Sequence, residues 1–494
     1  MKPNILFLVI DSLRQDKCLG ENKSSKTPNL DKLINNGVFF RETISPASIT
    51  IPSLSSIFTG KYPFECTTLD NDLFNLKTNS HTFIHELANS GYTTHAIIPD
   101  AFLHTNIPCL FSKYEFFNSF STLYDENLGE RIVNKIKNLS KEQPWFLYVH
   151  LEDLHGNAIF HLSDNDKINS YSGNNQYDKM LSALDFWLGK ISNTLKTENT
   201  LFIITSDHGS TTADFTEKMF KFNLQNDQLR DNKKITESKN LLRSDVMKSY
   251  NEKQSISYKI GHKFFTSLPD SLQVFRKKSA DAYIKKRKKT IKKNLLTRLN
   301  KIEKLNPTPY QKRLLQKSVI YPNDCYDENF RPALIFSGYN IPPKKTINSQ
   351  ISSIDIFPTI LEIIEIDTQM NSHGRSVLPL INNENFEENP AFLDNAAISS
   401  EIEYGDTVGV RTSNFKYFRD RINPEKDVHL FNLINDPLEL SNISKENSDI
   451  VEKFEKNLLQ INPSGKFSFE QTNELNKDDT EKAKDILRNL GYIK

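Results

Sequence analysis

Acidic residues and histidines stand directly after apolar segments at three places in the chain. Asp11 ends the segment NILFLVID, Asp153 and His155 follow WFLYVHL, and Asp207-His208 follows LFIIT. A carboxylate beside an imidazole can present two ligands to one divalent ion, and the glycine after His208 permits a tight turn. Each feature alone also has an ordinary structural interpretation, such as a helix N-cap at Asp11.

A hydroxyl group stands at the start of a predicted helix in the segment ASITIPSLSSIFTGKYP. Thr50 precedes Ile-Pro-Ser and an apolar run that stops at Gly60. Helix N-termini bind anions, so this hydroxyl is expected to face an anionic group, with a simple N-cap as the alternative.

The elements that must position these residues follow an alternating pattern. Continuous apolar runs of strand length alternate with helical patterns, one beginning at Thr27 and stopping at Gly37 and another ending near Gly91. Such runs are typical of strands buried on both faces of an open α/β sheet. Ligands of these sheets bind beyond the carboxyl ends of the strands, so the acidic and histidine residues above are expected at one edge. Short segments after residue 395, VGVRT, FKYFRD and HLFNL, predict a smaller antiparallel sheet.

Composition excludes several classes of protein. The 494 residues are 37% hydrophobic and 25% charged, which excludes disorder or a fibre for most of the chain. The four cysteines contain no CxxC pair, which argues against a disulfide framework or a structural zinc site and favours a reducing compartment. The apolar run near the N-terminus is too short for a signal sequence, and no other run is long enough to span a bilayer. We therefore expect a cytoplasmic protein.

Charge is concentrated in one segment. Residues 271–320 contain 16 Lys and Arg but only 2 Asp and Glu, a net charge of +14 against +1 for the whole chain. Apolar residues between Ile284 and Leu305 recur at helical spacing within it. The segment is predicted to contact an anionic membrane, peripherally, or a polyanion, and the alternative is a solvated helix that packs on the body of the protein. No nucleic-acid partner is expected, because aromatic residues for base stacking are few.

The order of motifs along the chain resembles the sulfatase family of the alkaline phosphatase superfamily. The matching segments include PNILFLVIDSLR, TPNLDKLINNGVFF, TIPSLSSIFTGKYP, PWFLYVHLEDLHG, FIITSDHG, SSIDIFPTILEII and HLFNLINDPLELSNI. The resemblance implies an alkaline-phosphatase-like α/β fold: a large, mostly parallel sheet flanked by helices, with a smaller C-terminal antiparallel-sheet subdomain. It divides the chain into a catalytic core at 1–214 and 321–394, a basic helical insertion at 215–320, and the small subdomain with a tail helix at 395–494.

The sequence departs from the family at the nucleophile. Sulfatases carry a C-x-P-S-R type signature whose Cys or Ser becomes formylglycine, and the aligned residues here are Thr50, Pro52, Ser53 and Leu54. Threonine cannot form that aldehyde, whereas a phosphothreonine can be attacked by water or by an acceptor hydroxyl. The expected activity is therefore a metal-dependent hydrolase or transferase that cleaves a phosphate mono- or diester, small, glycan-linked or lipid-linked, through a Thr50 covalent intermediate. The alternatives are a sulfuric ester hydrolase without formylglycine and an inactive binding protein.

The resemblance to the Thr-dependent members of the superfamily also implies site residues. The metal ligands would be Asp11, Thr50, Asp207 and His208. One imidazole and few carboxylates favour Mn or Zn, with Ca or Mg left open. His155 would be the general acid or an oxyanion contact.

Further residues are assigned to the substrate or to alternatives. Lys61, Arg14, His150 and Lys317 are candidate substrate-binding residues. Arg14 pairing with an acid, a core role for His150 and Tyr321 in place of Lys317 remain open. Glu152 and Asp153 would be candidates for a second metal site. The oligomeric state is not assigned.

Overall fold

The computed structural model of the protein describes residues 2–71, 73–119, 121–124, 127–161, 166–228, 297–320, 324–395, 406–472 and 480–484. Most of the predicted basic stripe falls on residues 271–296, and the predicted tail helix ends within 485–494. Both lie outside the described residues, so contact with a membrane or polyanion through 271–320 stays a prediction.

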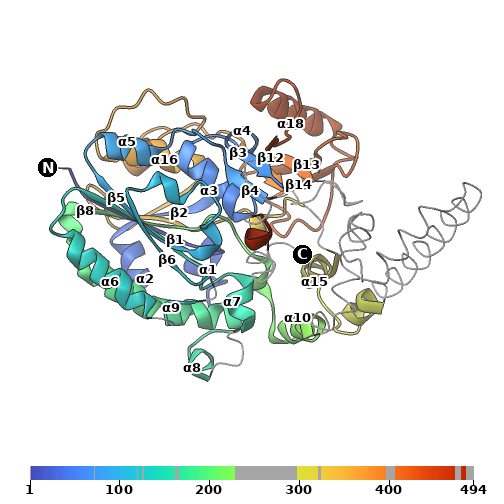
Figure 1. The fold of residues 1–494 in the computed structure, drawn as a ribbon. Coiled ribbons are helices and arrows are strands. Elements are labelled where there is room, and N and C mark those ends of the chain that lie inside the picture. The colour runs from blue at the N-terminus through green and yellow to red at the C-terminus, as the bar shows by residue number, and fades with distance from the viewer. Residues whose placement is uncertain are drawn as a thin grey trace, which may run out of the picture. The chain divides into compact units, whose positions relative to one another are not determined.

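Eight of the described strands form one large sheet in the order β10-β2-β9-β8-β1-β7-β5-β6 (Figure 1). Neighbouring strands are parallel except at β9, which is antiparallel to both β2 and β8. This confirms the predicted mostly parallel sheet. The strands are β1 (Asn4–Ile10), β2 (Gly37–Ile44), β5 (Thr93–Pro99), β6 (Lys113–Phe117), β7 (Trp145–Leu151), β8 (Thr200–Thr205), β9 (Leu334–Gly338) and β10 (Lys345–Ser352).

The three central strands β8, β1 and β7 are buried along their whole length. Their sequences show no alternation of polar and apolar residues because helices cover both faces of the sheet. Val9 of β1 pairs with His150 of β7 and with Thr205 of β8. The carboxyl ends of these three strands therefore lie side by side.

Helices cover the sheet in two layers, with α3, α5 and α16 on one face and α2, α6 and α9 on the other (Figure 1). The first layer and the sheet share one apolar core. The helices of this part of the chain are α1 (Gln15–Cys18), α2 (Pro28–Asn35), α3 (Thr50–Thr59), α4 (Pro63–Cys66), α5 (Phe83–Asn89), α6 (Leu128–Leu139), α7 (Gly156–His161), α8 (Asp166–Asn169), α9 (Gln176–Thr194), α16 (Ile356–Ile363) and α17 (Leu378–Ile381).

Glycines end the predicted helices in two of three cases. Gly60, with φ 67°, follows α3, and Gly91, with φ 90°, follows α5 shortly after its last residue. Gly37 instead opens β2, after α2 has ended at Asn35. A side chain at position 37 would overlap the backbone carbonyl of Phe336, so this glycine is required by the close approach of β2 and β9.

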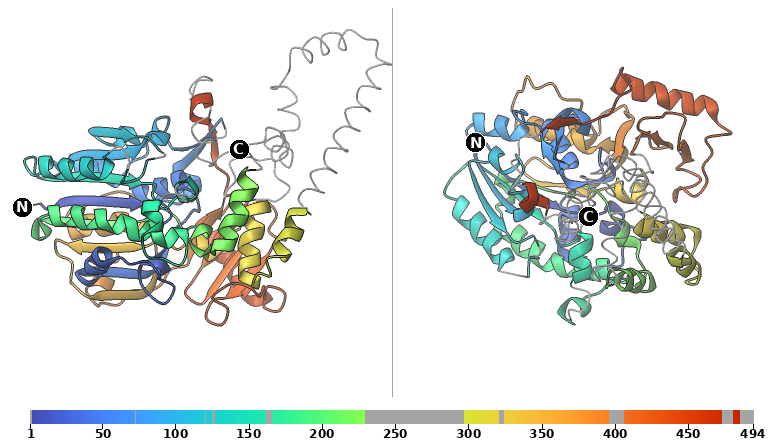
Figure 2. Two further views of the ribbon diagram at one scale, coloured as in Figure 1. Left: turned by 90° about the horizontal axis from the view of Figure 1, so that it is seen from below. Right: turned by 45° about the vertical axis from the view of Figure 1, so that its right-hand side comes forward.

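The C-terminal part contains the predicted antiparallel sheet, in the order β11-β12-β13-β14 (Figure 2). Its strands are β11 (Ala391–Asn395), β12 (Thr407–Arg411), β13 (Phe415–Asp420) and β14 (His429–Asn432), and α18 (Ser448–Ile461) packs on it through Phe454 and Leu458. The sheet therefore begins four residues before the predicted boundary at 395. A third, small sheet joins β15 (Glu470–Thr472), β3 (Thr67–Asp70) and β4 (Leu73–Leu76).

The chain divides into two compact units. The first comprises Met1–Thr216, Asn323–Ile398 and Asp406–Ile493, and the second comprises Glu217–Pro322, Ser399–Gly405 and Lys494. The second contains α10 (Glu217–Gln228) and α15 (Pro309–Ile320). Among the described residues, the helices are too short or too polar to cross a lipid bilayer.

Candidate metal and nucleophile site

The carboxyl ends of the three central strands bring acidic and histidine side chains together. Asp11 follows β1, Asp207 follows β8, and His150 lies near the end of β7. The Asp11 N–H donates to the carbonyl of Leu151 at 2.8 Å, which ties the ends of β1 and β7 together. The side chains of Asp11, His150 and Asp207 are completely buried.

The four predicted ligands are linked by three short separations. The Oγ1 of Thr50 lies 3.4 Å from Oδ2 of Asp11 and 3.4 Å from Nε2 of His208, and that Nε2 lies 3.4 Å from Oδ2 of Asp207. These separations exceed those of good hydrogen bonds. Each of these three separations is close to the roughly 3.4 Å between two ligands that lie about 2.1 Å from one ion. The structure therefore brings the four predicted metal ligands close to one another, in pairs whose spacing suits ligands of a divalent ion.

Neighbouring polar groups hold these ligands in orientation. Ser12 donates to Oδ1 of Asp11 at 2.6 Å, and the backbone N–H of His208 donates to Oδ1 of Asp207 at 2.9 Å. The Nδ1–H of His208 donates to the carbonyl of Gly209 at 2.7 Å, which leaves the Nε2 lone pair facing Thr50. Oδ2 of Asp207 is buried and makes no hydrogen bond within the described chain. A buried carboxylate oxygen in this position is well suited to a cation.

The charges of the site are mutually stabilising. Burial alone would raise the pKa of Asp11, but His155, His150 and His208 outweigh it and hold that pKa well below its usual range. Burial alone would lower the pKa of His208, but Asp207 and Asp11 outweigh it and raise it. Burial, together with His208, lowers the pKa of His155 despite Asp11. The carboxylate of Asp11 is therefore held ionised, as a metal ligand must be.

Thr50 is placed by the N-terminus of α3. The N-cap of this helix is Ile49, and Thr50 is the first helical residue, so its hydroxyl is directed to the site and does not cap the helix. The helix N-terminus favours negative charge at this point. Leu54, which stands where the family signature has arginine, is completely buried in the apolar core.

Two histidines of the β7 segment lie near the metal ligands. His155 precedes α7 and is close enough to Asp11, His208 and Asp207 to affect their charges. His150 shares a hydrogen bond of 3.0 Å between its Nδ1 and the hydroxyl of Tyr148, and its Nε2 lies 3.9 Å from Oδ2 of Asp11. One ligand atom each from Asp11, His150 and Asp207 lie within 4.8 Å of one another.

Two further predicted residues, Lys61 and Arg14, have other positions or partners within the first unit. Lys61 follows Gly60 at the opposite end of α3 from Thr50, and ten helical residues span about 15 Å. The guanidinium of Arg14 pairs with Asp16 at 2.8 Å and with Asp214, as the alternative prediction held. Lys317 belongs to α15 in the second unit, and Tyr321 lies outside the described residues.

Glu152 and Asp153 are both buried after β7, and the backbone N–H of Leu123 donates to Oδ1 of Asp153 at 3.1 Å. The contribution of His150 to the cluster of possible ligands was not predicted, because its distance from Asp11 depends on the pairing of β1 with β7. The available signal was Tyr148 two residues earlier, which points to the same face of the strand.

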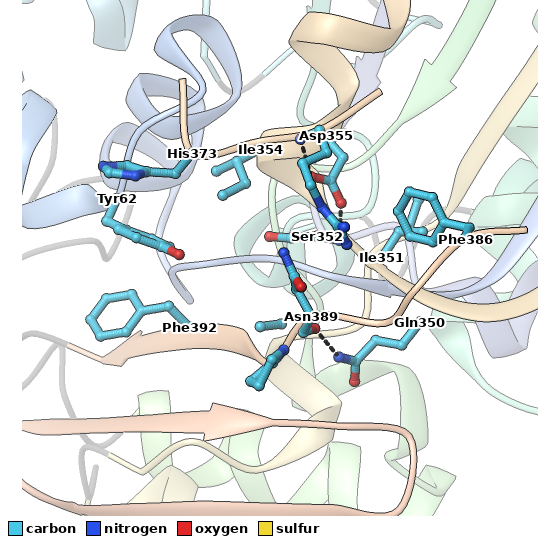
Figure 3. Close-up of a pocket in the computed structure, with 13 residues that line it drawn as sticks. Tyr62, Gln350, Ile351, Ser352, Ile354, Asp355, His373, Phe386, Asn389 and Phe392 are labelled. Carbon is cyan, nitrogen blue, oxygen red and sulfur yellow. Dashed lines mark hydrogen bonds between the residues drawn. The ribbon is translucent and has the colours of Figure 1, made fainter. Parts of the chain in front are cut away.

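A small pocket with about 30 Å³ of space lies at a different place, between the end of β10 and β11 (Figure 3). Its lining includes Tyr62, Gln350, Asp355, His373 and Arg375, and the predicted site residues are not among those that line it. Its free volume corresponds to about one water molecule.

Comparison with known proteins identifies the family. A model of the sulfatase family matches residues 3–261, more than half of the chain, and a model described as N-sulphoglucosamine sulphohydrolase, C-terminal, matches residues 322–464. The chain belongs to the sulfatase family, whose members typically use a divalent metal ion.

Individual relatives are distant. The chain is 34% identical to human arylsulfatase H over 105 residues, 19% of each chain, so it spans about a fifth of that relative. It is 21% identical to N-acetylglucosamine-6-O-sulfatase of Bacteroides thetaiotaomicron over 94% of this chain and 88% of the relative.

Solved structures show the same fold. A structure in complex with its substrate D-glucosamine-2-N,6-O-disulfate aligns with a TM-score of 0.61 at 16% identity, over 95% of this chain and 100% of the other. The phosphonate monoester hydrolase of Agrobacterium radiobacter aligns with a TM-score of 0.59 at 15% identity, over 94% and 96% of the two chains. At these sequence identities the alignments show a shared fold and do not show which reaction this chain catalyses.

Proposed function

We propose that the protein is a metal-dependent ester hydrolase that cleaves a phosphate mono- or diester with Thr50 as the nucleophile. The main observation that supports this proposal is the position of the Thr50 hydroxyl at the N-terminus of α3. It lies 3.4 Å from both Oδ2 of Asp11 and Nε2 of His208. Nucleophilic hydroxyls are activated in this way by a neighbouring base or a metal.

The side chains of the site have separate roles in the proposed reaction. Asp11, Thr50, Asp207 and His208 would hold the ion, with manganese or zinc favoured. When bound, it would lower the pKa of the hydroxyl and neutralise charge on the phosphoryl group. The Thr50 hydroxyl gives its proton to Oδ2 of Asp11 as Oγ1 attacks phosphorus, the bond from phosphorus to the leaving oxygen breaks, and His155 supplies a proton to that oxygen.

The second step returns the enzyme to its starting state. Water gives a proton to His155 and attacks the phosphorus of the phosphothreonine, the Thr50 Oγ1–phosphorus bond breaks, Oγ1 regains its proton from Asp11, and phosphate leaves. An acceptor hydroxyl in place of water would make the same chemistry a transfer. Threonine favours this route over the sulfatase route, because it cannot be converted to formylglycine.

The substrate class is proposed as a small or glycan-linked ester. A relative is named for N-acetylglucosamine-6-O-sulfate, and one structural neighbour was solved with a sulfated glucosamine. The same names favour a second candidate function, that of a sulfuric ester hydrolase that works without formylglycine. The retention of all four predicted metal ligands argues against a third candidate, an inactive binding protein.

The test is turnover of aryl phosphate monoesters, phosphate diesters, phosphonates and sulfates with Mn²⁺, Zn²⁺ or Ca²⁺. We expect phosphate-ester turnover that is lost by at least about a thousandfold in Thr50→Ala and retained in part by Thr50→Ser, since the hydroxyl is the reacting group. Thr59→Ala, at the other end of α3, is the matched control and keeps the activity.

The intermediate gives an independent readout. Rapid quenching followed by peptide mass spectrometry is expected to find one phosphoryl group on the peptide that contains Thr50. Turnover of sulfates alone would establish the second candidate, and the absence of Thr50-dependent turnover of every ester would establish the third.

A further inference from the structure

His150 is a completely buried histidine with one ring nitrogen directed into the site. Its Nε2 makes no hydrogen bond within the described residues, and neither does Oδ2 of Asp207. The ring is held from behind, with the ring of Phe102 at a centroid distance of 5.0 Å. An unpaired nitrogen buried beside two carboxylates is unfavourable unless something bridges them.

The distances between Nε2 of His150 and the two carboxylates suit a bridging metal ion. Nε2 lies 3.9 Å from Oδ2 of Asp11, which is too long for a hydrogen bond. Two ligands that each lie about 2.0–2.2 Å from one ion are separated by roughly 3–4 Å. One ligand atom each of His150, Asp11 and Asp207 lie within 4.8 Å of one another, so a small shift closes the set around an ion.

Tyr148 supplies the support that a ligating histidine needs. Its hydroxyl lies 3.0 Å from Nδ1 of His150, and both side chains are completely buried. Metal-bound histidines usually donate their second N–H to a neighbouring acceptor, which fixes the lone pair of the other nitrogen toward the metal. With Nδ1–H donating to the phenol oxygen, Nε2 presents its lone pair to Asp11 and Asp207.

We propose that His150 is a ligand of the same ion as Asp11 and Asp207, and that Tyr148 positions it. With His208, the set then contains two imidazoles, and it discriminates against calcium, which takes oxygen ligands. The inference rests on the proposed function in one respect, because both require a divalent ion at Asp11 and Asp207.

The experiment measures metal binding and not turnover. Full-length protein is stripped with a chelator, and its affinities for Zn²⁺ and Ca²⁺ and its absorption spectrum with Co²⁺ are recorded. His150→Ala is expected to bind Zn²⁺ about 10–100-fold more weakly, with a changed Co²⁺ spectrum and unchanged Ca²⁺ affinity, and Tyr148→Phe to show a smaller loss of Zn²⁺ affinity. His95→Ala removes a buried histidine of the neighbouring strand β5 and is the matched control, expected to bind as the wild type does.

The possible results separate this inference from the proposed function. Unchanged Zn²⁺ affinity and Co²⁺ spectrum in folded His150→Ala, with binding abolished in Asp207→Asn, would overturn the role of His150 alone. A wild-type protein that binds no divalent ion would overturn both proposals. If the alanine variant does not fold, His150→Gln provides the same comparison with a polar side chain in place of the imidazole.

Discussion

At the residue scale, Thr50 and Leu54 lie one helical turn apart and meet opposite environments. The hydroxyl of Thr50 faces the carboxylate of Asp11 and the imidazole of His208, whereas Leu54 is completely buried with Ile57 and Phe58 in the core. An arginine in place of Leu54 would have to bury its charge among apolar side chains. The departure from the sulfatase signature is therefore built into the packing of α3 as well as into the nucleophile.

Asp355 is a buried carboxyl in the pocket of Figure 3, outside the site that contains Thr50. It accepts from the backbone N–H groups of Ser352 at 2.8 Å and Arg375 at 2.9 Å. Burial raises its pKa to about 6, since these contacts offset only part of the cost of burying the charge.

A pH dependence of stability follows from that shift. Between pH 4 and 6 the folded protein holds a proton on Asp355 that the unfolded chain has released. The contribution of Asp355 to the free energy of unfolding therefore falls as pH rises through this window, by up to about 3 kcal/mol. In Asp355→Asn this contribution is absent, so urea unfolding at pH 4.5 and pH 7 should show the wild type losing stability relative to the variant at the higher pH. Parallel pH profiles for the two proteins would contradict the assignment.

The sequence predicted the positions of single residues at the sheet edge where a short motif contained them. Asp11, Thr50, Asp207 and His208 each end a strand or begin a helix, so local pattern was sufficient to bring them to one edge. Lys61 was assigned by its closeness to Thr50 in sequence, but a helix carries the chain away from the site over the intervening residues. The position of His150 relative to Asp11 depends on strand pairing, which no local pattern contains.

At the element scale, the order of strands decides the site. β8, β1 and β7 are neighbours although β7 and β8 lie far from β1 in sequence, and their carboxyl ends supply Asp207, Asp11 and His150. Continuous apolar runs predicted buried strands correctly. They did not predict that β9 runs antiparallel, because a strand buried on both faces is apolar in either direction.

The turn after β8 leaves no room for a side chain at Gly209. A Cβ there would overlap the backbone carbonyl of Glu328, and the Gly209 N–H donates to the carbonyl of Asn329 at 2.9 Å. Gly209→Ala is therefore expected to displace the turn that holds Asp207 and His208. We predict at least tenfold weaker Zn²⁺ binding and a loss of about 1–3 kcal/mol in the free energy of unfolding.

The control for this change is Gly156→Ala, at the start of α7. A Cβ at that position would meet only the methyl group of Thr212, at an ordinary contact distance of 3.4 Å. Calorimetric titration and urea unfolding of the two variants compare a crowded with an uncrowded glycine near the same edge of the sheet. Equal metal affinity in both variants would show that the turn adapts to the added methyl group.

At the scale of the whole molecule, two family models match successive parts of the chain, and buried charges join those parts. Arg411 of β12, in the C-terminal sheet, donates to Glu42 of β2 at 2.9 Å, to Gln350 of β10 at 2.7 Å and to Asp327 at 2.9 Å. Arg411 and Asp327 are buried. Residues 3–216 of the first matched segment and most of the second, 322–464, belong to one compact unit, and the pair of Arg411 with Glu42 joins them.

Removing Arg411 should weaken the contact between the C-terminal sheet and the large sheet. In Arg411→Met the carboxylates of Asp327 and Glu42 lose their shared cation, and the loss of one partner of a buried ion pair costs about 3–5 kcal/mol. Lys416 still pairs with Asp327, so the lower end of this range is expected. The double variant Arg411→Met, Asp327→Asn removes the stranded charge as well, and should lose less stability than the sum of the two single variants. Urea unfolding of the wild type, the two single variants and the double variant measures this coupling. Strictly additive losses in the free energy of unfolding would mean that Arg411 and Asp327 stabilise the protein independently.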